Sequence, residues 1–225
     1  MKPALSNRDK GGIMARSKAM RWILAVALVV VLPGMARAAR GFYLGAGMGA
    51  AVPGFGGDVT DISPDSGLNA ELIHLGYNFT DQWGIGLQWG AAAGTADDFL
   101  GDDTVWSQGY YTLSGRYSFD QGQQFVPYIE AGFGDYVFMI TGDGGDFASD
   151  PELGCRIAVG GQFYLGRFYL SPEISYHVVS YDQGEFDLAK PLFQGYPKNF
   201  DSDFHTRGDV LIIQLKVGYH WRQTR

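Results

Sequence analysis

Apolar and polar residues alternate along residues 209–221, near the end of the chain. One set of alternate positions is apolar throughout: Leu211, Ile213, Leu215, Val217, Tyr219 and Trp221. The other set turns polar over its second half, with Gln214, Lys216 and His220. A period of two residues is that of a β-strand with two different faces. A strand that crosses a bilayer has about 9–11 tilted residues, one face on lipid and aromatic residues at the interface. The pattern therefore predicts a membrane-crossing strand.

Seven earlier stretches alternate in the same way. They cover residues 41–50, 68–79, 83–93, 106–119, 125–140, 153–165 and 168–180. Long and short connections alternate strictly between them. This is typical of an up-and-down barrel with short turns at one rim and long loops at the other. Closure leaves no sheet edge whose unpaired N–H and C=O groups would face lipid. We expect an all-β fold, a closed eight-stranded antiparallel transmembrane β-barrel.

Aromatic residues gather next to the short turns. They are Tyr77, Phe79, Trp83, Tyr117, Phe119, Phe125, Phe163, Phe168, Tyr219 and Trp221. Aromatic side chains at one level around a barrel form an interface girdle. A soluble barrel would instead hold bulky apolar side chains inside and polar ones outside. The faces expected to point inward here carry Gly, Ser, Gln, Glu, Arg and Lys, whereas Trp89, Ile129 and Leu215 are expected to face lipid.

The N-terminal segment has the features of a secretory signal peptide. Basic residues precede an apolar run over residues 22–32, and the small-x-small site Ala36-Arg37-Ala38 follows. The run is too short to span a membrane as a helix. We expect a signal peptide over residues 1–38, with Met1, Met14 or Met20 as its start, and one barrel domain over residues 39–225.

Charge and cysteine content narrow the functional classes. Residues 1–38 hold seven of the 17 Lys/Arg and one of the 24 Asp/Glu, so the remainder carries ten basic and 23 acidic residues, a net charge of −13. A chain this acidic, without a basic cluster, is a poor nucleic-acid binder. The single Cys155 excludes an internal disulfide and a cysteine metal site, and we expect it to be a small apolar residue on a strand.

Three stretches resemble the small outer-membrane barrels of the OmpA/OmpX type: residues 75–81 (LGYNFTD), 127–134 (PYIEAGFG) and 217–221 (VGYHW). The resemblance implies the outer membrane of a Gram-negative bacterium and contact with its lipid and lipopolysaccharide. It also implies the barrel-assembly machinery as a partner during biogenesis, and a monomer. The even strand number implies that both termini lie in the periplasm. Two departures from the family are expected: Trp221 does not end the chain, and no peptidoglycan-binding domain follows.

Charged side chains are expected inside the barrel. The inward faces carry His74, Arg116, Glu130, Arg156, Glu173, His177 and Lys216. The lumen of an eight-stranded barrel is only wide enough for side chains to fill it, and buried charges must pair. We expect Glu130 to meet Arg116 and Glu173 to meet Lys216, and a lumen without a continuous pore. The alternative is a narrow channel for small solutes, which the many inward glycines would favour by leaving space.

The alternative hypothesis from another functional class is an outer-membrane enzyme that modifies lipid A. A serine hydrolase needs a serine and a histidine within hydrogen-bond reach, with an acid that orients the histidine. Glu173, Ser175 and His177 all fall on the inward face of one strand, whereas a site acting on lipid A must face lipid. We therefore expect neither an enzyme nor a cofactor.

The long loops carry the remaining candidates. The longest holds apolar residues suited to binding a partner: Phe186, Leu192, Phe193, Tyr196, Phe200 and Phe204. Asp143, Asp146 and Asp150 could supply oxygen ligands to a divalent cation, but their spacing matches no known calcium loop. The sequence thus predicts a structural or interaction role: envelope integrity, adhesion or ligand binding through extracellular loops.

Overall fold

The computed structural model describes residues 40–57, 63–97, 104–119, 125–142, 145–181, 184–187 and 206–222. Every regular element in these ranges is a β-strand. No helix in the described part of the chain is long and apolar enough to cross a membrane. The expected signal peptide, residues 1–38, lies outside the described residues.

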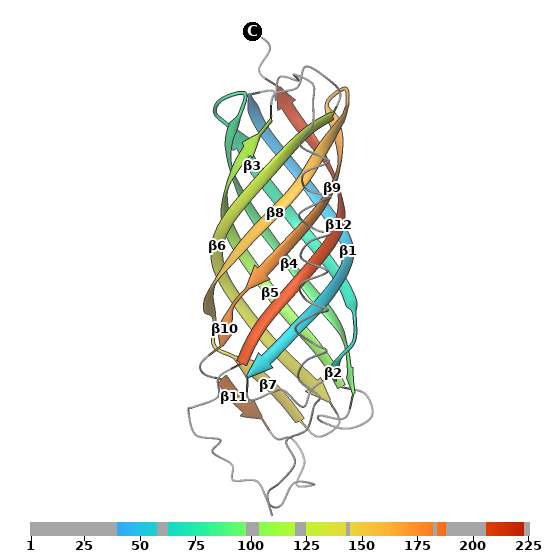
Figure 1. Ribbon diagram of the computed structural model, residues 1–225, viewed down its shortest axis with the longest axis vertical. Helices are drawn as coiled ribbons and strands as arrows, with labels where there is room; N and C mark the ends of the chain where they lie inside the picture. Colours follow the sequence, from blue (N-terminus) through green and yellow to red (C-terminus); the bar gives the residue numbers. More distant parts are fainter. Residues whose placement is uncertain are drawn as a thin grey trace, which may run out of the picture. The chain divides into compact units, whose positions relative to one another are not determined.

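Eight long strands form the barrel wall (Figure 1). They are β1 Gly41–Gly57, β3 Gly67–Asn78, β4 Trp83–Asp97, β5 Thr104–Ser118, β6 Phe125–Gly142, β8 Glu152–Leu165, β9 Phe168–Val178 and β12 Thr206–Arg222. Each pairs antiparallel with the next along the chain, and the pairing of β1 with β12 closes the cylinder. This closed barrel confirms the expected fold class.

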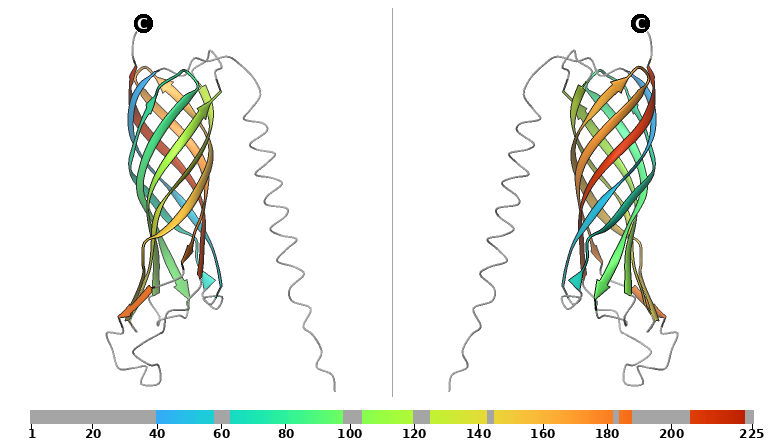
Figure 2. Two further views of the ribbon diagram at one scale, coloured as in Figure 1. Left: turned by 90° about the vertical axis from the view of Figure 1, so that its left-hand side faces the viewer. Right: turned by 90° about the vertical axis from the view of Figure 1, so that its right-hand side faces the viewer.

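Four short strands extend the wall at the loop-side end (Figure 2). They are β2 Ser63–Pro64, β7 Gly145–Ser149, β10 Ser180–Tyr181 and β11 Gly184–Asp187. β7 folds back on the end of β6, and β11 pairs with β7. The alternation predicted strands over residues 125–140 and 153–165 with only a long connection between them; this was wrong for residues 145–149, because hairpin pairing continues beyond the wall. β1 and β12 also run several residues further toward the loops than their alternation predicted.

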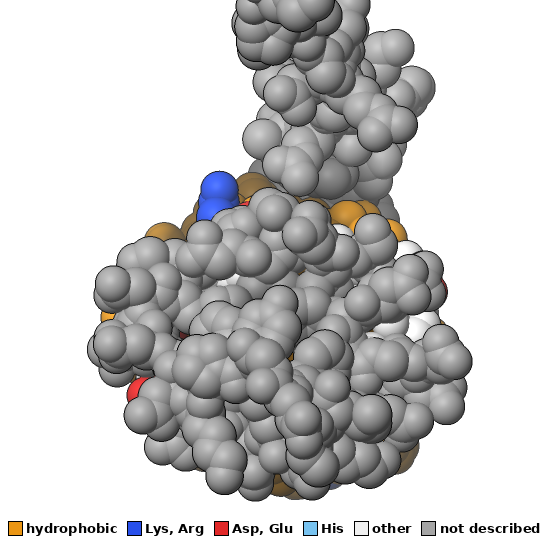
Figure 3. All heavy atoms as spheres, turned by 90° about the horizontal axis from the view of Figure 1, so that it is seen from below, with side chains coloured by type: hydrophobic (Ala, Val, Ile, Leu, Met, Phe, Trp, Pro, Cys, Tyr) orange, Lys and Arg blue, Asp and Glu red, His pale blue; other side chains and the backbone are white. Residues whose placement is uncertain are grey.

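The two faces of the wall are those the alternation predicted. Trp89, Ile129 and Leu215 point outward with 50%, 44% and 49% of their surface exposed. Hydrophobic side chains appear at several places around the outer edge when the barrel is viewed from its loop-side end (Figure 3). A bilayer, rather than water, suits such a surface.

One strand departs from strict alternation. The pairing of β3 with β4 shifts by one residue between Glu71 and Ile73, which leaves Leu72 as an extra residue. Leu72 and Ile73 are both exposed, so the inward positions before the bulge are Asn69 and Glu71. A β-bulge of this kind places two residues opposite one and reverses the phase of the strand. Regular alternation over residues 68–79 would place Ala70 on the lumen side together with His74; that expectation is wrong for this reason, and Ala70 is exposed.

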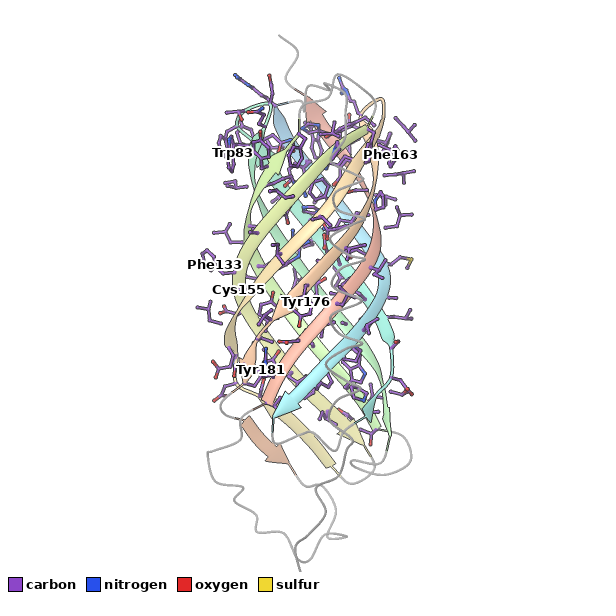
Figure 4. The ribbon with its side chains drawn as sticks, in the orientation of Figure 1. Trp83, Phe133, Cys155, Phe163, Tyr176 and Tyr181 are labelled. Carbon is purple, nitrogen blue, oxygen red and sulfur yellow. The ribbon has the colours of Figure 1, made fainter. Side chains whose placement is uncertain are left out.

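The rim with the short turns carries the aromatic girdle. Trp83 lies against Tyr117 with ring centroids 4.9 Å apart, and Phe168 lies against Tyr219 at 5.2 Å. Trp83 and Phe163 point away from the wall near this rim (Figure 4). Gly166, in the turn between β8 and β9, has φ of +69°, a left-handed conformation that glycine adopts without strain. β1 begins and β12 ends at this same rim.

Candidate functional site: a lumen filled by side chains

Six charged side chains form one chain of alternating sign across the middle of the lumen. Arg116 lies 2.7 Å from Glu130, and Arg156 joins Glu130 to Glu173 at 2.5 Å from each. Lys216 then joins Glu173, at 3.0 Å, to Glu71, at 2.9 Å. All six are at most 3% exposed. Three carboxylates thus meet three cations, and each of these six charges has a partner of opposite sign.

The expected pairs Arg116–Glu130 and Glu173–Lys216 are both present. The register also sets Arg156 opposite His177. Two features of this network were not predicted from the sequence. Arg156 links the two pairs through both carboxylates, and Glu71 belongs to the chain because the bulge at Leu72 turns it inward. A signal for Glu71 existed, since the adjacent apolar residues Leu72 and Ile73 interrupt the alternation.

His74 contacts three of these charged groups. Its Nε2 lies 3.0 Å from Arg116 Nη2, and its Nδ1 lies 3.3 Å from Glu71 Oε1 and 3.4 Å from Lys216 Nζ. A guanidinium can only donate hydrogen bonds, so Nε2 must accept one and the ring proton belongs on Nδ1, facing Glu71. This tautomer is neutral, and the charges of the layer then sum to zero.

Neutral side chains take up further hydrogen-bonding positions of the carboxylates. Gln214 Nε2 donates to Glu71 at 3.0 Å and to Glu173 at 2.9 Å. Tyr128 donates to Glu173 at 2.8 Å, and Gln88 donates to Glu130. The guanidinium of Arg116 also stacks on the Tyr128 ring, 4.1 Å from its centroid. Such bonds offset part of the cost of removing the charges from water.

An apolar layer fills the lumen between the charged layer and the loops. Its members are at most 5% exposed: Ala51, Ala92, Ala96, Trp106, Tyr110, Tyr136, Phe138, Ile140, Val179, Tyr181, Val210 and Ile212. Phe138 stacks on Tyr181 with centroids 5.7 Å apart, and Phe55 packs on Trp106 and Phe138. Tyr181 lies inside the loop-side end of the barrel (Figure 4). The expectation of polar inward faces was wrong at this level, where the strands reach beyond the charged layer.

A second, smaller apolar layer lies toward the short-turn rim. Tyr43, Val126, Tyr164 and Tyr169 form it, and Tyr164 lies 5.8 Å from His220 between ring centroids. The charged layer therefore has packed aromatic side chains on both sides.

The inward glycines make room for these aromatic side chains. A Cβ on Gly160 would lie 2.6 Å from Tyr128, and one on Gly90 would lie 2.5 Å from the Tyr110 hydroxyl. A Cβ on Gly45 would lie 2.5 Å from the Tyr169 hydroxyl. These glycines do not leave open space, because the ring of a neighbouring tyrosine fills the space beside each of them. The hypothesis that they open a channel is not supported at these three positions.

His177 and Ser175 contact each other without the third member of a catalytic triad. Ser175 Oγ lies 3.2 Å from His177 Nε2, but His177 Nδ1 faces the Tyr136 hydroxyl at 3.1 Å and not a carboxylate. Both side chains are 1% exposed and point into the filled lumen. The pair therefore has neither an orienting acid nor access to a lipid substrate.

Most of the loop candidates lie outside the part of the chain that the structure describes. Leu192, Phe193, Tyr196, Phe200, Phe204 and Asp143 lie outside the described residues, as do the side chains of Phe186 and Asp146. Asp150 is described and is exposed just after β7. No group of three or more His, Cys, Asp or Glu suited to a metal occurs within the described ranges.

A closed antiparallel barrel with an apolar exterior, an aromatic girdle and a polar, filled lumen defines a transmembrane β-barrel protein. Residues 22–221 match the family model of the outer membrane protein beta-barrel domain, so the chain belongs to this family. It is thus a protein of the outer membrane of a Gram-negative bacterium, with membrane lipid around its wall.

Two solved barrels share the fold. Neisserial surface protein A, from Neisseria, is 14% identical with a TM-score of 0.59, over 81% of this chain and 99% of that one. The outer membrane protein OprG from Pseudomonas aeruginosa is 15% identical with a TM-score of 0.51, over 84% of this chain and 98% of that one. No curated protein matches the sequence.

Proposed function

We propose that this protein is a non-conducting outer-membrane barrel with a structural or interaction role, whose long loops face the exterior and whose termini lie in the periplasm. The observation that carries the proposal is the chain of six alternating charges across the lumen, together with the apolar layer on its loop side. Function then belongs to the wall and the loops, because paired charges and packed rings occupy the lumen within the described ranges.

The energetics support a closed lumen. Removing one partner from a buried ion pair costs about 3–5 kcal/mol, because the other charge stays buried without compensation. Opening a path through this layer would break several linked pairs at once, since Arg156 and Lys216 each bridge two carboxylates. The tightly packed Tyr136, Phe138 and Tyr181 would also have to move.

Single-channel recording in planar bilayers tests the proposal. The folded protein is expected to show no stable conductance above that of a bare bilayer, and liposomes that contain it should not swell in small sugars. A variant with Arg156→Ala, Phe138→Ala and Tyr181→Ala removes side chains from the charged layer and from the loop-side apolar layer, and is the positive control. A stable, large conductance of the unaltered protein would contradict the proposal and favour a small-solute channel.

The expected lack of activity and the expected partners of the barrel each need a separate measurement. We infer no enzymatic activity, no cofactor and no nucleic-acid binding; unchanged lipid A masses in cells that overproduce the protein would support the first. We infer contact with lipopolysaccharide and with the barrel-assembly machinery, and a monomeric state. Replacement of Phe193 and Tyr196 by Ser tests whether the longest loop mediates adhesion, with barrel folding as the control.

A further inference from the structure

The outer wall carries an apolar groove of about 420 Å³ near the short-turn rim. Six outward side chains line it: Leu44, Leu165, Phe168, Leu170, Val217 and Tyr219. They come from β1, β8, β9 and β12, which are neighbours in the wall. The groove therefore follows the lipid-facing surface over four strands.

The floor of the groove lies where Gly45, Gly218 and Tyr169 are neighbours in the wall. Gly45 pairs with Gly218 across β1 and β12, and the neighbouring outward position Ala46 pairs with Val217. Gly45 and Gly218 face the lumen and pack against the ring of Tyr169, so the groove lies between the outward side chains of their neighbours. A lipid-facing hollow bounded by aliphatic and aromatic side chains matches the polarity of an acyl chain.

An arginine lies beside the groove, at the short-turn rim. Arg167 lies in the turn between β8 and β9, next to the lining residue Phe168, and its Nη1 donates to the Tyr219 hydroxyl at 3.0 Å. Its backbone oxygen accepts from His220 N at 2.8 Å, which anchors the turn to β12. No carboxylate of the described residues forms an ion pair with Arg167, whereas Arg40 at the same rim lies 3.6 Å from Asp81. The Tyr219 hydroxyl, which accepts from Arg167, can still donate its own hydrogen.

We propose that this groove is a phospholipid-binding site, in which Arg167 and the Tyr219 hydroxyl hold the phosphate and the groove holds an acyl chain. Arginine is suited to a phosphate because its planar fork donates two parallel hydrogen bonds. The aromatic girdle marks the headgroup level, so the guanidinium and the phosphate share one depth in the membrane. The source is a phospholipid of the periplasmic leaflet, which rests on the proposed orientation of the barrel.

Native mass spectrometry of the detergent-solubilised full chain tests the site with phosphatidylglycerol, phosphatidylethanolamine and lipopolysaccharide as separate probes. The unaltered protein should retain one phospholipid. Arg167→Ala should weaken its retention about tenfold, the effect of losing one charge-assisted hydrogen bond, and the control Arg40→Ala should not. Val217→Trp fills the groove and should abolish retention, whereas Ile129→Trp, elsewhere on the lipid-facing wall, should not. Heat-modifiable gel mobility checks that each variant is folded.

A phospholipid with a photoreactive group at the end of its acyl chain gives a second measurement. Crosslinks should fall on β1, β8, β9 and β12, and should lose that preference in Val217→Trp. Equal retention by the Arg167 and Arg40 variants, labelling spread evenly around the barrel, or a second copy of the chain in place of lipid would overturn the proposal. Arg167-dependent binding of lipopolysaccharide alone would overturn the assignment to a periplasmic phospholipid. None of the four substitutions touches the lumen, so bilayer conductance reports on the closed lumen independently.

Discussion

Lys216 reaches Glu71 across the strand that separates them, with Nζ and Oε1 2.9 Å apart. Lys216 lies on β12 and Glu71 on β3, and both pair with Gly47 of β1 between them. A Cβ at Gly47 would lie 2.9 Å from Cγ of Lys216, so only glycine leaves room for the lysine to pass. The ion pair thus depends on a bulge in one strand and on the absence of a side chain in another.

The Lys216–Glu71 contact should behave as a buried ion pair. Lys216→Met leaves Glu71 without a cation and is expected to lower the free energy of unfolding by about 3–5 kcal/mol. The double variant with Glu71→Gln restores neutrality, so it should lose less than the sum of the single changes, by roughly 1 kcal/mol or more. Urea titration in lipid vesicles, followed by tryptophan fluorescence, measures all of these; strict additivity would contradict the coupling.

The stability cost of replacing a glycine by alanine should depend on whether the glycine faces the lumen or the lipid. Gly160→Ala places a methyl group 2.6 Å from the Tyr128 ring and hydroxyl, and overpacking of this kind costs about 1–3 kcal/mol. Gly115 faces outward with nothing within 4 Å of its Cβ position. Gly115→Ala is therefore the matched control, expected within about 0.5 kcal/mol of the unaltered protein. Equal effects in urea titration would show that the lumen has free space at Gly160.

A charge on the lipid face should cost more in the middle of the wall than at its rim. Leu215→Arg is expected to lower the free energy of unfolding by about 2–4 kcal/mol, and Leu165→Arg, beside the short turn, by about 0–1 kcal/mol. Leu215 and Leu165 are 49% and 63% exposed, so lost packing contributes little to the difference. Similar costs at the two sites would contradict the depth assigned to them.

Cys155 should report on the lipid environment. It is exposed on the outer face, paired with Phe133 on one neighbouring strand and Val178 on the other. In vesicles it should react with an apolar maleimide but not with a sulfonated one, which cannot enter the bilayer. The urea-unfolded protein should react with both reagents. Rapid labelling of the folded protein by the sulfonated reagent would place this part of the wall in water.

Much of the architecture follows from local rules that operate within each strand. Alternate residues of a strand lie on opposite faces, so the outward positions of Trp89, Ile129 and Leu215 and the inward position of Glu130 could be predicted without tertiary information. The Arg116–Glu130 pair was also predictable, because the two residues lie opposite each other across a short turn.

Contacts between strands distant in the chain depended on the closed barrel. The bulge at Leu72 reversed the phase of β3 and added Glu71, and the stagger of the strands set Arg156 between two carboxylates. The loop-side apolar layer and the groove beside Arg167 each combine side chains from several strands. The sequence alone determined which face each residue takes wherever the alternation is regular, because that is a property of one strand. Only the tertiary structure decided which side chains meet, because that depends on the register of all eight.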